Sequence, residues 1–402
     1  MPHPLIVPGF LALHSHRAEV LAETLSAWLT SQPLAALEQE VVLVQSNGMA
    51  EWIKMALAGR GGGVCAATRV ELPSRFLWRT YRQVLGPANV PPESPLDKLP
   101  MTWRLMALLP ACVGDAVFQP VAGFLRGQQS ESEPERLMQL ASRLADLFDQ
   151  YQIYRPDWLQ DWAEGRNVLR HQPEQAVRPH DATRQLPTDQ LWQAELWRRV
   201  LATLSDAEKQ LTRPALHLQA LARLQSGQAL ATPVARRVSV FGMSQMPSQL
   251  LEMLAALSTH SQVLLAVPNP CQYHWGDIMD GRDALRAERR RHGYKKENLS
   301  TVPFEQMHLH APALLAAWGR QGRDFIRQLD AFDDLQAAQE RMPGQRLDLF
   351  DDAPGADASR LLMQLQNRIR DLRSAQDPVD ASLRPDDDSI VFKVAHRAVR
   401  HL

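Results

Sequence analysis

Residues 40–52 read Glu-Val-Val-Leu-Val-Gln-Ser-Asn-Gly-Met-Ala-Glu-Trp. The continuous run of three valines and a leucine at 41–44 is typical of a parallel strand that is buried on both faces. Ser46, Asn47 and Gly48 then predict a short loop, and a helix is expected from about residue 49 to 58. The stretch therefore predicts a strand, a loop and a helix, which is the repeating unit of an α/β fold.

The same alternation extends to both sides of this stretch. Ser15 is expected to cap the first helix, because a serine hydroxyl can accept a hydrogen bond from a free backbone N–H of the first turn. The pattern indicates an α/β fold with a parallel sheet. Further strands are expected at residues 10–13, 68–71, 237–241 and 262–267, and further helices at residues 17–30, 74–85 and 248–257.

A mainly helical segment interrupts the alternation, and the chain ends in acidic, proline-containing stretches. Asp357 is expected to cap the last helix. Helices are expected at residues 101–109, 134–150, 188–204, 313–329 and 358–372, a long polar loop at 164–186, acidic linkers at 348–354 and 377–388, and a last strand at 389–394.

These segments predict the domain organisation. Residues 1–90 and 233–345 are expected to form the α/β core, and residues 91–232 a helical insertion. Residues 346–388 are expected to form a helix and an acidic linker, and residues 389–402 the start of a second domain. Because a strand needs a neighbour and almost nothing follows residue 394, we expect the chain to stop inside that domain.

Composition restricts the classes of function. The 44 lysines and arginines nearly balance the 45 acidic residues, so a nucleic-acid-binding surface would have to be local. Cys65, Cys112 and Cys271 stand too far apart in sequence to predict a metal site or a disulfide framework. The N-terminus does not resemble a secretory signal, and no stretch approaches the roughly 20 apolar residues that cross a bilayer. We therefore expect a cytoplasmic protein.

The loop at residues 45–51 stands where an α/β protein commonly binds nucleotide phosphates. Hydrolysis also needs a lysine for the outer phosphates and a Ser or Thr for magnesium, but this loop has one glycine and no Gly-Lys-Ser/Thr. The strand at 237–241 is followed by Gly-Met-Ser-Gln, without the acidic pair that would hold magnesium. The absence of both features argues against ATP hydrolysis. From local spacing alone, an ordinary strand-to-helix turn that never bound a nucleotide is the favoured interpretation of the loop.

Three other features have alternative interpretations. His308 and His310 could share a strand face, but no third metal ligand stands nearby in sequence. Asp146 and Asp149 lie three residues apart on one helix face, as a metal-binding or acid–base pair would, or as part of a hydrogen-bonding surface. Residues 282–296 contain Arg-Arg-Arg and Lys-Lys, which could contact phosphates or form a solvated helix face.

Collinear motifs extend over nearly the whole chain: VQSNGMAEW at 44–52, LPSRFLW at 72–78, MTWRLM at 101–106, ADLFDQY at 145–151, YRPDWL at 154–159, NPC at 269–271, WGDI at 275–278 and WG at 318–319. In these motifs the chain resembles the RecC family, the gamma subunits of bacterial RecBCD exodeoxyribonuclease V. The family proteins are far longer, and this chain resembles roughly their first third. Residues 397–402 depart from the family pattern, which a truncated or frameshifted reading frame would explain.

The resemblance implies an inactivated superfamily 1 helicase-like fold, with a parallel sheet and a large helical insertion. It implies a subunit without activity of its own in an ATP-dependent exodeoxyribonuclease and helicase that acts in double-strand break repair and recombination. Such a subunit scaffolds the RecB and RecD motors, receives double-stranded DNA ends, guides the split single strands and reads Chi on the 3′-ended strand. ATP and magnesium would be used by the partner subunits, with no cofactor or metal bound by this chain.

The resemblance also implies a set of DNA-contacting residues. Trp78 would stack on a base, the amides Gln45 and Asn47 would donate to and accept from base edges, and Arg155 would donate to a base or a phosphate. A core role for Trp78 on its helix stays open. The family positions that line the Chi-reading channel map onto Gln45, Asn47, Glu51, Leu72, Trp78, Asp146, Leu147, Asp149, Arg155 and Arg213.

Two of these positions depart from the family pattern. Asn47 and Glu51 stand where the best-known pattern has Thr and Gln, and Glu51 adds negative charge where DNA would pass. Two further functions remain as alternatives: a DNA-stimulated ATPase with a degenerate phosphate loop, and a protein-interaction module that never contacts DNA.

Overall fold

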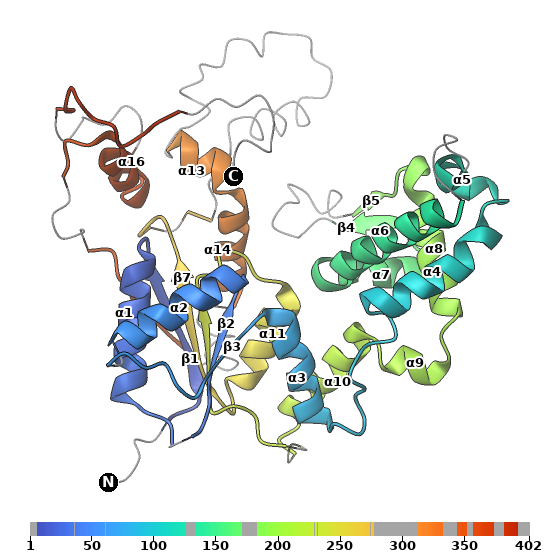
Figure 1. Ribbon diagram of the computed structural model, residues 1–402, viewed down its shortest axis with the longest axis horizontal. Coiled ribbons are helices and arrows are strands. Elements are labelled where there is room, and N and C mark those ends of the chain that lie inside the picture. Colours follow the sequence, from blue (N-terminus) through green and yellow to red (C-terminus); the bar gives the residue numbers. More distant parts are fainter. Residues whose placement is uncertain are drawn as a thin grey trace. The chain divides into compact units, whose positions relative to one another are not determined.

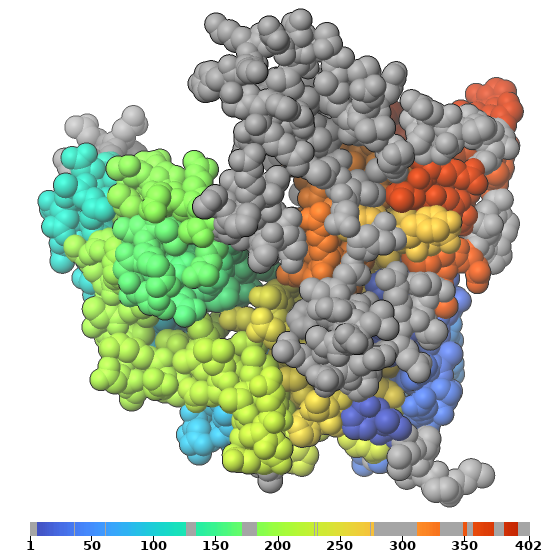
Figure 2. All heavy atoms as spheres, turned by 180° about the vertical axis from the view of Figure 1, so that it is seen from behind, coloured from blue at the N-terminus to red at the C-terminus, as the bar shows by residue number. Residues whose placement is uncertain are grey.

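The chain forms two compact units in the computed structural model. The first, which we call the sheet unit, comprises residues 1–72, 237–246 and 262–402; the second, the helical unit, comprises residues 73–236 and 247–261 (Figure 1). The domain boundaries expected from the sequence remain predictions. The structure describes the residues whose atoms are coloured in Figure 2: 6–35, 37–60, 62–125, 133–170, 183–228, 230, 232–273, 275–276, 312–332, 344–351, 357–373 and 382–392.

A six-stranded sheet forms the centre of the sheet unit. All its neighbouring strands pair in parallel, in the order β3-β2-β6-β7-β1-β8. The predicted α/β class with a parallel sheet is therefore confirmed, whereas descent from a helicase domain remains a prediction. The strands are β1 (Gly9–Ser15), β2 (Glu40–Val44), β3 (Thr68–Glu71), β6 (Arg237–Phe241), β7 (Gln262–Pro268) and β8 (Gly344–Asp348).

Helices α1 (Ala18–Ser31) and α2 (Asn47–Arg60) pack on this sheet through their apolar side chains. Leu21, Leu25 and Ile53 are fully buried against Val42 and other side chains of the central strands. The spacing of these residues puts one apolar stripe of each helix toward the sheet. The remaining helices of the unit are α13 (Ala313–Trp318), α14 (Arg320–Phe332) and α16 (Leu361–Arg370).

The helical unit has its own hydrophobic core, in which the largest buried side chains are Phe118, Phe148, Trp162 and Trp197. This core surrounds the long helix α6, which packs on α4 and carries α7 at its end. The α-helices are α3 (Pro73–Leu85), α4 (Lys98–Cys112), α5 (Gln119–Leu125), α6 (Glu133–Tyr154), α7 (Pro156–Ala163), α8 (Leu191–Ala202), α9 (Asp206–Gln210), α10 (Arg213–Gln225) and α11 (Ser248–Leu257), with 3-10 turns η1 (Ala116–Phe118) and η4 (Thr188–Gln190).

Several local predictions were wrong. The polar segment 164–186 contains two short antiparallel strands, β4 (Val168–Arg170) and β5 (Thr183–Gln185), rather than only a loop. The edge strand β8 was missed because its sequence, Gly-Gln-Arg-Leu-Asp, has no apolar alternation. The helix expected at 313–329 is broken at Gly319, where a Cβ atom would lie 2.9 Å from the Trp275 ring. Residues 389–392, expected to begin a strand, form none.

Both predicted helix caps were also wrong. Arg17 occupies the cap position of α1, and its backbone N–H donates to the Ser15 hydroxyl oxygen at 3.1 Å. Helix α16 begins after Arg360, because the Asp357 carboxylate accepts from the backbone N–H and hydroxyl of Ser359 in the preceding turn. In each case a local turn uses the oxygen that was expected to cap the helix.

Some predicted features lie outside the described residues: His308, His310, the basic segment 282–296 and residues 393–402. Within the described part of the chain, no single helix is both long and apolar enough to cross a bilayer. Among the described helices, one bent pair passes that test of length and composition: α4 taken with Ala116–Leu125, across a 118° bend.

A buried arginine holds together the amino ends of the central strands. Arg237, at the start of β6, has no exposed surface and donates to Glu40 at the start of β2 and to Gln262 at the start of β7, each at 2.7 Å. It also donates to the backbone oxygen of Gln32, just after α1, at 2.5 Å. Burial raises the pKa of Glu40, and the Arg237 charge opposes that shift.

Arg237→Met should destabilise the sheet unit by about 3–5 kcal/mol, because it leaves the Glu40 carboxylate buried without its guanidinium partner. The double variant Arg237→Met with Glu40→Gln should recover part of this loss, since no buried charge is then unpaired. Urea unfolding of the chain measures both. An Arg237→Met protein within about 0.5 kcal/mol of the parent would contradict the role assigned to this ion pair.

Candidate nucleic-acid interface

The ten residues predicted to contact DNA are divided between the two units. Gln45, Asn47, Glu51 and Leu72 belong to the sheet unit. Trp78, Asp146, Leu147, Asp149, Arg155 and Arg213 belong to the helical unit.

In the sheet unit, the turn between β2 and α2 exposes the two predicted amides. Gln45 and Asn47 are both exposed, so their side chains are available to donate and to accept. Between them, the Ser46 hydroxyl accepts the Met49 backbone N–H at 3.2 Å and caps the helix. The turn therefore presents neutral hydrogen-bonding groups, and one of the backbone donors that a phosphate would use is already bonded.

Apolar side chains fill the carboxyl ends of β2 and β6. Gly242 follows β6 with a φ of +69°, and a Cβ atom there would lie 3.4 Å from the Met49 methyl carbon. Trp52 stacks on Phe241 with 5.6 Å between ring centroids. The place where a lysine and a magnesium-binding carboxylate would act on a nucleotide therefore holds a thioether and two aromatic rings.

The other two predicted residues of the sheet unit have structural contacts. Glu51 forms an ion pair with Lys54 at 2.9 Å on the exposed face of α2, which partly offsets its negative charge. Leu72 is half-buried and packs against the hydrophobic core of the sheet unit. Of the four, Gln45 and Asn47 are the residues best placed to meet an external partner.

In the helical unit, Trp78 is anchored and lines a hollow. The ring is half-buried on α3, its Nε1–H donates to the Pro91 backbone oxygen at 3.1 Å, and it meets Tyr81 edge-on. Tyr81 is itself buried and hydrogen-bonded to His217 at 3.1 Å. Trp78 also borders a hollow of about 430 Å³. The indole is thus fixed in orientation without being enclosed in the core.

Ion pairs bring three of the predicted residues together. Arg213, at the start of α10, lies 2.7 Å from Asp97 and 2.9 Å from Asp149 of α6. Lys98, next to Asp97, forms a 2.6 Å ion pair with Asp146. We call these five residues the α6 ion-pair cluster. Burial raises the pKa of Asp149, against the opposing charge of Arg213. Asp97 and Lys98 were missed, because nothing in their local sequence signals partners on α6 and α10.

Leu147 stands apart from this cluster. It is half-buried and packs against the hydrophobic core of the helical unit, which leaves only part of its side chain available to a ligand.

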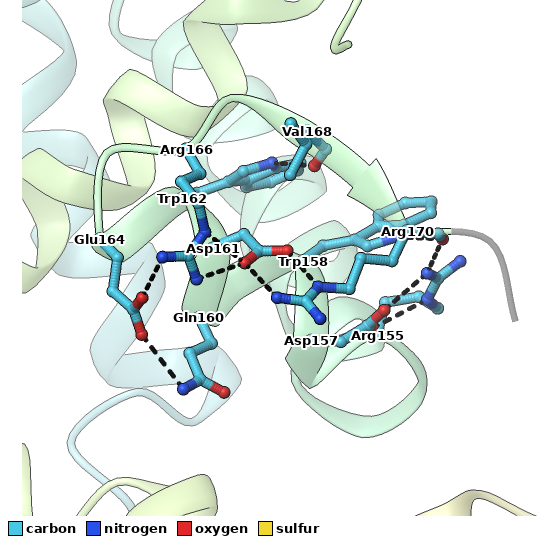
Figure 3. Close-up of polar contacts among 10 residues, drawn as sticks. All are labelled: Arg155, Asp157, Trp158, Gln160, Asp161, Trp162, Glu164, Arg166, Val168 and Arg170. Atoms are coloured by element: carbon cyan, nitrogen blue, oxygen red, sulfur yellow. Dashed lines mark hydrogen bonds and ion pairs between the residues drawn. The ribbon is translucent and has the colours of Figure 1, made fainter. Parts of the chain in front are cut away.

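Arg155 is held between α6 and α7 (Figure 3). Its guanidinium donates to both oxygens of Asp157, at 3.0 and 2.8 Å, and its carbon lies 3.8 Å from the centroid of Trp158. It also donates to the backbone oxygen of Arg170. A predicted DNA contact is therefore rigidly positioned by an acid, an aromatic face and a strand.

The support of Arg155 depends on a buried carboxylate. Asp161 has no exposed surface and accepts from Arg170 at 2.5 and 2.7 Å and from Arg166 at 2.5 and 2.9 Å (Figure 3). Hydrogen bonds from Arg170 are the main reason why the pKa of Asp161 is lowered. Trp158 and Trp162 add indole hydrogen bonds to the oxygens of Arg170 and Val168, so β4 is fastened to α7.

Asp161→Asn should lower the stability of the helical unit by about 1–3 kcal/mol, because it leaves two arginines without their shared charged acceptor. A lowered carboxyl pKa contributes stability that is fully present above the unfolded value, about 3.9, and is lost as pH falls through the folded value. The parent should therefore lose stability below about pH 4 more steeply than the variant. Thermal unfolding between pH 3 and 7 measures this difference.

Asp206→Asn is the matched control, because Asp206 is an almost fully exposed aspartate paired with Lys209 on α9. It should change stability by less than about 0.5 kcal/mol. Equal effects of the two substitutions would contradict a supporting role for Asp161.

In the part of the chain that the structure describes, no three His, Cys, Asp or Glu side chains gather as metal ligands would. Amides can donate to and accept from base edges, an indole can stack on a base, and a carboxylate can accept from an exocyclic base amine.

Comparison with known proteins identifies relatives over the whole chain. Residues 10–372 match the family described as RecC, N-terminal domain. The RecBCD enzyme subunit RecC of Haemophilus influenzae is 33% identical over 418 aligned residues, covering 98% of this chain and 36% of the relative. The Escherichia coli subunit of the same name is 31% identical, covering 97% and 34%. These matches confirm the resemblance carried by the motifs, and this chain spans about a third of the length of these relatives.

Proposed function

The chain belongs to the RecC family, and we propose on that basis that it serves as the non-catalytic, DNA-handling part of a RecBCD-type helicase and nuclease. In this proposal it helps to scaffold the RecB and RecD motors, guides separated strands and reads Chi on the 3′-ended strand. It would act in double-strand break repair and recombination, and ATP and magnesium would be used by the partner subunits.

The burial and fixed orientation of the Trp78 ring are the main support for this proposal. A core tryptophan would be enclosed, but this ring is half-buried and borders a hollow. Its hydrogen bond to Pro91 holds the ring in one orientation, so little side-chain freedom is lost when a base stacks on it. An aromatic ring fixed beside an open space supports binding of single-stranded nucleic acid, whose unstacked bases are accessible.

The α6 ion-pair cluster supports base reading as well. Asp146 and Asp149 retain part of their surface exposed, at 41% and 30%, although each has a cationic partner. A carboxylate has about four lone-pair sites, so one ion pair leaves capacity to accept from an exocyclic amine. The partners hold the acids in place and offset the charge that would otherwise repel DNA phosphates.

The apolar filling beside Gly242 supports the absence of intrinsic ATP chemistry. Met49, Trp52 and Phe241 occupy the strand ends that would hold a nucleotide, and Gln45–Glu51 contains no lysine. The degenerate-ATPase alternative would require the triphosphate to bind there without a cationic side chain from this turn.

Trp78→Ala should weaken binding of a single-stranded oligonucleotide by about 5- to 150-fold, because one base–indole stack contributes about 1–3 kcal/mol. Fluorescence anisotropy with the 402-residue chain measures the affinity, and thermal unfolding should show little change. Trp103→Ala, which removes an exposed indole of α4, is the control and should bind as the parent does. A large loss of stability with unchanged DNA binding would return Trp78 to a core role.

The purified chain should show no DNA-stimulated ATP hydrolysis. Turnover that disappears on Asn47→Ala or Gly48→Ala would establish the degenerate-ATPase alternative. The alternative of a pure protein-interaction module predicts that no photocrosslink forms between DNA and this chain within the assembled complex.

A further inference from the structure

Helix α3 places three arginines around Trp78. Arg75, Arg79 and Arg82 stand three residues before, one after and four after the tryptophan, which puts all four side chains on neighbouring positions of the helix surface. All four line the hollow of about 430 Å³, together with Gln83, Pro87 and Thr232. Among the described residues that line the hollow, none is acidic.

Arg75 and Arg82 differ from the arginines of the helical unit that form ion pairs within the chain. Several arginines of this unit have a carboxylate within 4 Å: Arg104, Arg155, Arg166, Arg170, Arg198, Arg199 and Arg213. Among the described residues, Arg75 and Arg82 have no such carboxylate partner. Arg79 donates to the neutral Gln83 at 3.2 Å and lies over the Phe76 ring. The hollow therefore concentrates positive charge beside an aromatic ring in a chain whose net charge is close to zero.

From this arrangement we propose that the α3 face binds the phosphodiester backbone of a single strand, with Arg75 and Arg82 contacting phosphates on either side of the base that stacks on Trp78. The inference rests on the proposed DNA-handling function and adds to it sequence-independent binding of the phosphate backbone. Guanidinium groups suit this task because they donate to phosphate oxygens in a fixed planar geometry.

The geometry favours a single strand over other anionic polymers. Arg75 and Arg82 are seven residues apart, about 10 Å along the helix axis, so more than one phosphate falls within their span. Stacking on Trp78 requires a base that is not already stacked in a duplex. An acidic peptide could satisfy the arginines but would leave the anchored indole without a matching flat partner.

The test measures how oligonucleotide affinity depends on salt between 50 and 200 mM, using the 402-residue chain and fluorescence anisotropy. Each phosphate contact to a single strand contributes about 0.7 to the slope of log K against log salt concentration. Arg75→Gln and Arg82→Gln should each make the slope shallower by about that amount, and the double variant by about twice as much. Trp78→Ala should lower the affinity and leave the slope unchanged, because stacking releases no counterions.

Arg184→Gln is the matched control, since Arg184 is an exposed arginine on β5 of the same unit and borders no part of the hollow. The inference is overturned if Arg75→Gln and Arg82→Gln keep the slope and affinity of this control, or if polyglutamate competes as well as the oligonucleotide.

The same measurements separate a failure of the phosphate-binding face from a failure of the proposed DNA-handling function. If Trp78→Ala weakens binding while the arginine variants do not change the slope, only the phosphate-binding face is wrong. If the parent chain binds no oligonucleotide, the phosphate-binding face and the proposed function are both contradicted.

Discussion

A parallel sheet brings the carboxyl ends of its strands to one edge, and the side chains that fill this edge decide what the fold can do. Here the ends of β2 and β6 are filled by Met49, Trp52 and Phe241, and the exposed turn above them carries amides. The amino ends of the same strands are joined by the buried Arg237. The buried charge of Arg237 thus joins the amino ends of the strands. The opposite edge of the sheet, where nucleotides commonly bind, is lined by apolar side chains and neutral amides.

The helical unit also pairs charges internally, but it carries a basic surface as well. Several of its acids and arginines pair with one another, among them Asp161 with Arg166 and Asp149 with Arg213. The chain as a whole carries 44 basic and 45 acidic residues, so a surface that attracts DNA has to be local. The α3 face departs from this pattern, with an indole fixed among arginines that border a hollow. A local basic surface of this kind is what a neutral chain needs if it is to hold DNA.

The sequence predicted three central strands of the sheet closely. Strands β2 and β7 consist mostly of apolar residues, β6 carries Arg237 and Ser239 among its apolar residues, and the ends of all three were predicted to within one residue. The polar edge strand β8 and the break at Gly319 were not predictable locally, because pairing with β1 and packing against Trp275 determine them. The candidate site was named through family resemblance. Its ion pairs join α4, α6 and α10, which no local pattern reveals, whereas the spacing of Arg75, Arg79 and Arg82 around Trp78 was visible in the sequence.

We expect a separated DNA strand to contact this chain at the anchored indole of Trp78. Photocrosslinking with a single-stranded oligonucleotide that carries 5-iodouracil, followed by trypsin digestion and mass spectrometry, locates that contact. Because trypsin cleaves after Arg75 and Arg79, the labelled peptide should comprise residues 76–79, and unlabelled single strand but not duplex should compete with the labelling. Crosslinks confined to peptides without Trp78, or none at all, would contradict it.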